Sequence, residues 1–128
     1  MNWHKDGTAA GPNQVFVFGS NVHGRHGAGA ALAAKLYHGA VQGVGEGMTG
    51  RAYALPTVDL TKGSLPLGQV QEAVARFLTF ARSQPETNFF VTRVGCGLAG
   101  YKDKDIAPMF KGAPDNCDMP EDWRAYLE

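Results

Sequence analysis

The sequence predicts a three-layer α/β/α fold with a mixed central sheet, and two observations support this class. Short apolar runs with the composition of buried strands alternate along the chain with segments of helical periodicity. Strands that are joined through helices usually pair in parallel, and the helices then cover both faces of the sheet. A length of 128 residues, of which 44% are hydrophobic, fits one folded domain spanning residues 1–128.

The first half of the chain predicts two strands and one helix. Residues 1–13 contain two glycines and a proline and predict an irregular lead-in. The continuous apolar run at 14–18 is typical of a strand buried on both faces. Residues 28–37 are rich in alanine and predict a helix that lies close to the sheet. Four glycines within 41–50 predict a mobile loop, and residues 51–55 predict a second strand that ends at the following proline.

The second half predicts a long helix and a third strand. Residues 57–66 form a connection, with Ser64 as the expected N-cap of the next helix and Pro66 in its first turn. Apolar residues at i, i+4, i+7, i+8 and i+11 from Val70 predict an amphipathic helix that ends before Pro85. The remaining predicted elements are a strand at 89–94, a short helix at 103–110 capped by Asp103, and a last helical turn starting at Pro120.

Composition limits the classes of partner. Lys plus Arg and Asp plus Glu number 12 each, so no overall field attracts a membrane surface or directs sequence-specific nucleic-acid binding. The N-terminus lacks an apolar signal core and no apolar run has membrane-spanning length, so we expect a cytoplasmic protein. Cys96 and Cys117 do not have the spacing of metal ligands, and they are compatible with free thiols or with a disulfide.

Two glycine-rich segments that follow predicted strands indicate an anion site. Residues 19–31 follow the first strand and place Gly27-Ala28-Gly29-Ala30 at a predicted helix start, where backbone N–H groups are free. Residues 95–101 follow the third strand and contain three glycines. Parallel strands bring such loops together at one edge of the sheet, where they suit a pyrophosphate. The alternative interpretation is that these glycines only form tight turns between strands and helices.

The two loops resemble those of the macrodomain family, whose members bind ADP-ribose and its derivatives. Gly27-Ala28-Gly29-Ala30-Ala31 is similar to the family's first phosphate loop, and Val94-Gly95-Cys96-Gly97-Leu98 is similar to its second loop. Ala52-Tyr53-Ala54-Leu55-Pro56-Thr57 resembles the middle strand and its exit. The nearest types are the glycohydrolases that remove terminal ADP-ribose and the related antitoxin macrodomains. The resemblance covers roughly residues 14–110 and implies a compact macrodomain-like fold.

The resemblance also implies how a ligand is held. Both loops would bind the diphosphate, Asn21 would lie near the distal ribose, and Tyr101 would lie against a sugar. The partner would be a small nucleotide-derived ligand or an ADP-ribosylated macromolecule, with no cofactor or metal. The residues predicted to bind the ligand are Ser20, Asn21, Gly27, Ala28, Gly29, Ala30, Gly95, Cys96, Gly97, Leu98, Ala99, Gly100 and Tyr101.

Departures from the family's pattern favour binding over hydrolysis. Ala99 stands where the terminal glycohydrolases have a catalytic Asp, and Val58 stands where a catalytic Lys is expected. In another hydrolytic branch an Asp follows the first glycine loop, and this chain has alanines there. Asp6 is a candidate for the acidic residue that contacts adenine.

Two enzymatic alternatives remain open from the sequence. His23, His26 or Asp59 are candidates to replace the missing catalytic groups in a hydrolase of ADP-ribosylated substrates or of ADP-ribose 1''-phosphate. Alternatively, Cys96 lies among backbone amides that stabilise a thiolate, so it is a candidate nucleophile of an unrelated nucleotide hydrolase.

Overall fold

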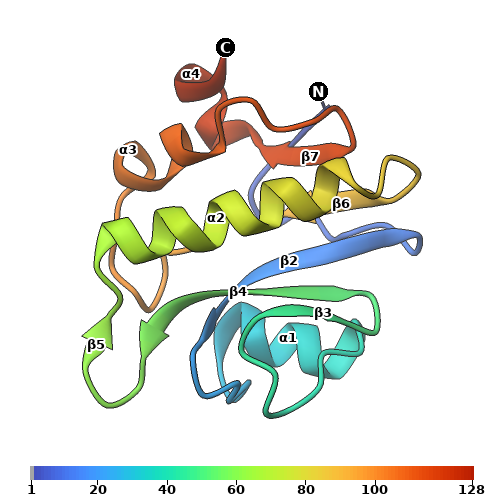
Figure 1. Cartoon of the computed structure of the whole chain (residues 1–128). Coiled ribbons are helices and arrows are strands. Elements are labelled where there is room, and N and C mark those ends of the chain that lie inside the picture. The colour runs from blue at the N-terminus through green and yellow to red at the C-terminus, as the bar shows by residue number, and fades with distance from the viewer. Residues whose placement is uncertain (1) are drawn as a thin grey trace.

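The computed structural model describes residues 2–128 and has an α/β fold. Within that range four α-helices surround a seven-stranded, mostly parallel mixed sheet (Figure 1). In chain order the elements are β1 (Asn2–His4), β2 (Gln14–Asn21), α1 (Gly29–Tyr37), β3 (Gly47–Thr49), β4 (Ala52–Asp59), β5 (Gly63–Ser64), α2 (Leu67–Arg82), β6 (Asn88–Val91), α3 (Asp103–Ile106), β7 (Cys117–Pro120) and α4 (Arg124–Leu127), with 3-10 turns at Ala107–Phe110 and Glu121–Trp123.

The sheet has the strand order β1-β7-β6-β2-β4-β3, and β5 also pairs with β4. β2 lies between β6 and β4 and is parallel to both, with Phe16 opposite Phe90 on one side and Ala52 on the other. β1, β7 and β6 continue the parallel part, whereas β3 and β5 pair with β4 in antiparallel fashion. The carboxyl ends of β2, β4 and β6 therefore meet at one edge of the sheet.

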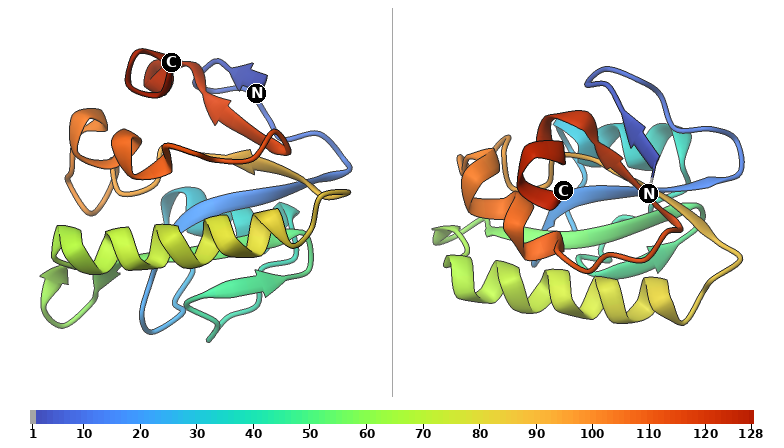
Figure 2. Two further views of the ribbon diagram at one scale, coloured as in Figure 1. Left: turned by 45° about the horizontal axis from the view of Figure 1, so that its top comes forward. Right: turned by 90° about the horizontal axis from the view of Figure 1, so that it is seen from above.

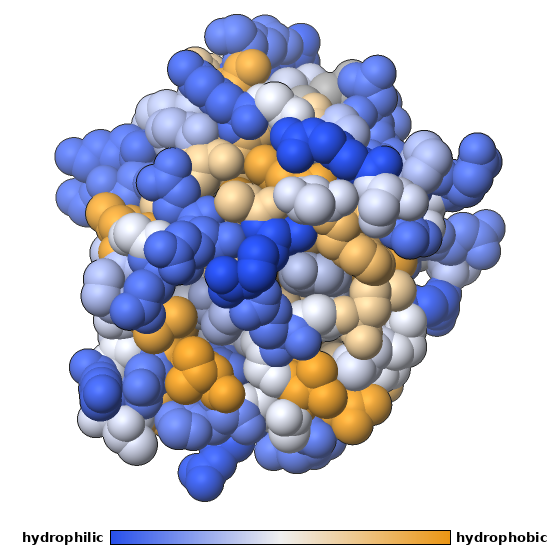
Figure 3. Space-filling model, in the orientation of Figure 1, coloured by the Kyte–Doolittle hydropathy of each residue, from blue (hydrophilic) through white to orange (hydrophobic). Residues whose placement is uncertain are grey.

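The two long helices lie on opposite faces of the sheet (Figure 2). α2 packs Val70, Val74 and Phe77 into the larger core cluster, which includes Phe89 and Trp123. The solvent side of this layer is mostly hydrophilic, with small hydrophobic groups between polar side chains (Figure 3). This pattern confirms the amphipathic helix that the sequence predicts.

The other face is covered by α1, and its core is built from small residues. Ala31 and Ala34 of α1 pack with Ala54 of the sheet and with Phe18. Side chains of this size let the helix axis approach the sheet, as the alanine-rich sequence predicts. The start of α1 is thereby fixed beside the end of β2.

Three expectations for strands are wrong. The lead-in is not wholly irregular, because β1 pairs with β7, a strand that the sequence did not predict. Residues 47–49 of the expected loop form β3. β4 does not stop at Pro56 but continues to Asp59, and the irregularity in its pairing with β2 falls beside this proline, between Ser20 and Asn21. A proline lacks an N–H, so a local shift in register accommodates it.

Two predicted helix caps are also wrong. The N-cap of α2 is Pro66, and Ser64 instead lies in β5, where its hydroxyl donates a hydrogen bond to the Ala99 carbonyl at 2.5 Å. Asp103 lies in the first turn of α3, one residue after the N-cap position. The backbone N–H of Lys102 is bound by the carboxylate of Asp105 at 3.1 Å.

No helix within residues 2–128 combines the length and apolar character needed to cross a membrane.

Candidate functional site

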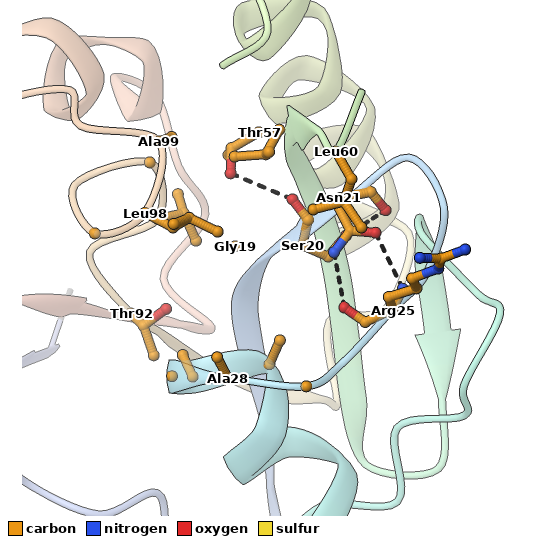
Figure 4. A pocket seen from close by; sticks show the side chains of 18 of the residues that line it. Gly19, Ser20, Asn21, Arg25, Ala28, Thr57, Leu60, Thr92, Leu98 and Ala99 are labelled. Atoms are coloured by element: carbon orange, nitrogen blue, oxygen red, sulfur yellow. Dashed lines mark hydrogen bonds between the residues drawn. The ribbon is translucent and has the colours of Figure 1, made fainter. Parts of the chain in front are cut away.

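A cavity of about 550 Å³ lies at the carboxyl ends of β2, β4 and β6 (Figure 4). Its size is in the range of small-molecule sites, and its position is the usual one for ligands of parallel sheets. The residues that line it are Gly19, Ser20, Asn21, Arg25, Gly27, Ala28, Gly29, Ala30, Ala31, Thr57, Val58, Leu60, Thr92, Arg93, Val94, Gly95, Gly97, Leu98 and Ala99.

The first glycine-rich loop offers free backbone donors to this cavity. The N–H groups of residues 27–31 have no hydrogen-bond acceptor in the part of the chain that the structure describes, and the first intrahelical bond is that from Leu32 to Ala28 at 3.2 Å. They lie at the positive end of the α1 dipole. Ala28 is the N-cap of α1 and has no side-chain oxygen to satisfy them. These amides are therefore available to an anion.

The second glycine-rich loop forms another wall of the same cavity. Its N–H groups at Gly97, Leu98 and Ala99 have no acceptor within residues 2–128. The loop is closed by hydrogen bonds from Gly100 to the Gly97 carbonyl and from Tyr101 to the Gly95 carbonyl, both 2.9 Å. Residues with free backbone amides from two separate loops therefore line one cavity.

Polar side chains in the cavity wall are mainly bound to the backbone. Both amide atoms of Asn21 bind Arg25, with Nδ2 donating to its carbonyl at 2.7 Å and Oδ1 accepting from its N–H at 3.0 Å. The Ser20 hydroxyl donates to the Gly45 carbonyl, and the Thr57 hydroxyl donates to the Ser20 carbonyl at 3.3 Å. These side chains set the shape of the cavity and leave few hydrogens for a ligand.

Arg93 lies where this cavity adjoins a smaller one of about 140 Å³. Its guanidinium donates to both carboxylate oxygens of Asp103, at 2.9 and 2.8 Å. Burial acts to raise the pKa of Asp103, but hydrogen bonds from Arg93 and Trp123 outweigh it and lower that pKa. The smaller cavity is lined by His4, Asp6, Gly7, Thr8, Phe16, Phe90, Thr92, Arg93 and Pro120.

The candidate catalytic residue His26 does not line the cavity. Its side chain is fully buried, and its ring meets Phe18 edge-on at a centroid distance of 5.2 Å. Nε2 donates to the carbonyls of Val41 and Val44, each at 3.1 Å. His26 therefore ties the glycine-rich segment 41–46, expected to be a mobile loop, to the back of the first amide loop.

His23 and Asp59 form a pair at the surface, and neither lines the cavity. His23 Nε2 lies 3.2 Å from Asp59 Oδ1. Hydrogen bonds from the Thr61 hydroxyl and backbone, and then from His23, lower the pKa of Asp59 to about 2. The sequence separates these residues by 36 positions, so their contact was not predictable from spacing.

Cys96, Gly100 and Tyr101 are predicted ligand-binding residues that lie outside the cavity. Tyr101 packs against the larger core, and its hydroxyl donates to the Leu65 carbonyl at 2.5 Å. The Cys96 thiol donates a hydrogen bond to the Asp103 carboxylate at 3.5 Å. Cys96 and Cys117 are both free thiols, so the alternative of a disulfide between them is wrong. Gly97 and Leu98 are exposed, whereas Cys96 and Tyr101 pack against the larger core.

The thiol of Cys96 will react slowly with electrophiles. Burial first, and then the Asp103 carboxylate, raise its pKa to about 12. At pH 8 its thiolate fraction is expected to be roughly a thousandfold below that of an ordinary cysteine. Iodoacetamide labelling followed by mass spectrometry measures this rate, with the urea-unfolded chain as the control. Fast labelling of folded protein that a ligand blocks would restore Cys96 as a nucleophile.

Several lining residues lie outside the predicted set. Thr57, Val58, Leu60, Thr92 and Arg93 follow or end strands, and this position at the carboxyl edge was the signal available in the sequence. Within residues 2–128 no group of three or more His, Cys, Asp or Glu side chains is arranged to hold a metal ion.

Comparison of the chain with models of known protein families, with curated proteins and with solved structures finds no match.

Proposed function

We propose that this protein binds ADP-ribose or a related ADP-ribosyl metabolite as a compact macrodomain-like module. The two sets of free amides on one cavity are the observation that carries the proposal. A diphosphate presents several acceptor oxygens close together, and amides at a helix start and in a glycine turn can bind them from two sides. The resemblance of both loops to macrodomain phosphate loops supports the same ligand class.

The smaller cavity is suited to the adenosine end of this ligand. It adjoins the main cavity at Thr92 and Arg93 and is lined by His4 and Phe90, whose rings stack on each other with centroids 3.8 Å apart. The carboxylate of Asp6 is exposed at this end and lies 3.8 Å from the Arg93 guanidinium. Aromatic faces and a carboxylate are suitable partners for a purine and its amino group.

The opposite end of the main cavity would then hold the distal ribose. Asn21 lies in this wall, and one of its two amide hydrogens is not used by Arg25. That hydrogen is the side-chain donor that we assign to the distal ribose.

Binding without hydrolysis is the form of the proposal that the cavity favours. The ionisable side chains among its described lining residues are Arg25 and Arg93, and arginine does not exchange protons near neutral pH. The candidates His23, His26, Asp59 and Cys96 are not among the lining residues, which supports binding without hydrolysis.

Calorimetry of the full chain with ADP-ribose tests the proposal. We expect a saturable heat for ADP-ribose and a weaker one for AMP, which lacks the second phosphate. ADP-ribosylated protein incubated with the chain should keep its modification. Absence of any heat at millimolar ADP-ribose would overturn the proposal, and release of ADP-ribose would overturn its non-catalytic part.

A further inference from the structure

We propose that the cavity selects an ADP-ribosyl ligand whose distal sugar carries an apolar group of a few carbon atoms. This inference rests on the proposed function, because it specifies the ligand of the same site. It follows from the kind of side chain found at the end of the cavity that lies away from the adenosine.

The two ends of the cavity differ in chemistry. The end at Thr92 and Arg93 continues into the smaller cavity with its aromatic rings, and the amide loops lie between the ends. The end at β4 is walled by Val58 and Leu60, which follow one another along the chain with one residue between them. A ligand that places adenosine at the first end and diphosphate on the amides brings its distal sugar to the second.

One exposed leucine, Leu60, stands at this second end, and another, Leu98, lines the cavity from the second amide loop. Leu98, on the second amide loop, is 83% exposed, and Leu60 is 44% exposed. Figure 4 shows them on different walls of the cavity, with Leu98 beside Ala99 and Leu60 beside Asn21. Covering an exposed leucine at the mouth of a cavity with an apolar group removes apolar surface from water, which favours binding.

Polar side chains at this end do not compete for that space. The hydroxyl hydrogens of Ser20 and Thr57 are used by backbone carbonyls, and Asn21 keeps a single amide hydrogen. The side chain of Arg25 extends away from Leu98 and Ala99 (Figure 4). A substituent on the distal sugar therefore meets mainly carbon atoms.

Two glycosides of matched size, together with ADP-ribose itself, test the inference. Calorimetry would compare ADP-ribose with its 1''-O-butyl glycoside and its 1''-O-(2-methoxyethyl) glycoside, which has an ether oxygen in place of one methylene. Each buried methylene contributes roughly fourfold in affinity, so we expect the butyl glycoside to bind about tenfold tighter than ADP-ribose. The methoxyethyl glycoside should bind within about threefold of ADP-ribose.

Variants locate the effect on the molecule. Leu60→Ser should remove most of the butyl preference while keeping ADP-ribose affinity, because Leu60 lies outside both amide loops. Leu36→Ser is the matched control, because Leu36 is 60% exposed on α1 and does not line the cavity. It should keep the full preference.

The outcomes separate the two proposals. Equal affinity of the butyl and methoxyethyl glycosides, with ADP-ribose still bound, overturns the inference and leaves the proposed function standing. Loss of the preference in the Leu36→Ser control also overturns the inference. Failure of all three ligands to bind overturns the proposed function together with the inference.

Discussion

Replacing Ala28 with Asp will make the fold more stable and will weaken the binding of ADP-ribose. Ala28 is the N-cap of α1, has extended backbone with φ −155° and ψ 160°, and makes no side-chain capping bond. An Asp carboxylate in this position accepts the free N–H groups of the first turn and interacts favourably with the helix dipole, contributing about 1 kcal/mol to the free energy of unfolding. α1 has no acidic residue in its first turn to do this already.

The same carboxylate will exclude the ligand. It occupies the amides that we assign to the diphosphate, and it adds a negative charge to the anion site. We expect affinity for ADP-ribose to fall roughly a hundredfold, which corresponds to about 2.7 kcal/mol. Urea unfolding measures the first effect and calorimetry measures the second.

Ala28→Ser separates capping from charge. Its hydroxyl caps the helix, so stability should rise by a similar amount, but it brings no charge and affinity should fall less than for Ala28→Asp. If Ala28→Asp binds ADP-ribose as the wild type does, the amides of residues 27–31 do not hold the diphosphate.

The uncapped start of α1 is consistent with the proposed function. Helices usually satisfy their first N–H groups with a side chain, and a chain selected for stability alone would place Ser, Thr or Asp at position 28. Here the N-cap is exposed alanine, and the amides face a cavity. The absence of a capping side chain beside a cavity, at a cost of about 1 kcal/mol, supports the proposal that the free donors serve a ligand.

The sequence predicted those parts of the fold that have a long periodic pattern. Val70 to Ala81 predicted α2, and the apolar run at 14–18 predicted β2, because each buries its side chains in a regular order. β1 and β3 are three residues long, and β7 is four, so none shows a period. Their pairing depends on strands far away in the sequence, which no local pattern contains.

The sequence predicted which backbone segments form the candidate site, but not which of their side chains point into it. Glycine content placed both amide loops, because loop flexibility and free N–H groups belong to the backbone. Which loop side chains turn inward depends on packing: His26 is held by the carbonyls of Val41 and Val44, and Tyr101 by that of Leu65. The sequence gives no signal for such contacts across 15 to 36 residues.

Gly24→Ala will be the most destabilising small substitution that we predict. Gly24 has φ +68°, and a Cβ there would lie 2.3 Å from the Gly43 carbonyl carbon and 2.5 Å from the Val44 nitrogen. Both neighbours are backbone atoms that cannot rotate away, and the Gly43 N–H donates to the Gly24 carbonyl at 2.7 Å. Left-handed strain of about 1–2 kcal/mol and overpacking of about 1–3 kcal/mol should together lower the free energy of unfolding by about 3 kcal/mol or more.

Gly43→Ala is the matched control for this substitution, because it lies on the other side of the same contact. Gly43 has φ +96°, but a Cβ there meets nothing within 4 Å, so it should cost only the backbone strain of about 1–2 kcal/mol. Urea unfolding of both variants measures the difference. Equal losses would mean that segments 20–26 and 41–46 are not packed as closely as described. A larger loss for Gly24→Ala, accompanied by weaker ADP-ribose binding, would show that this contact positions the first amide loop from behind.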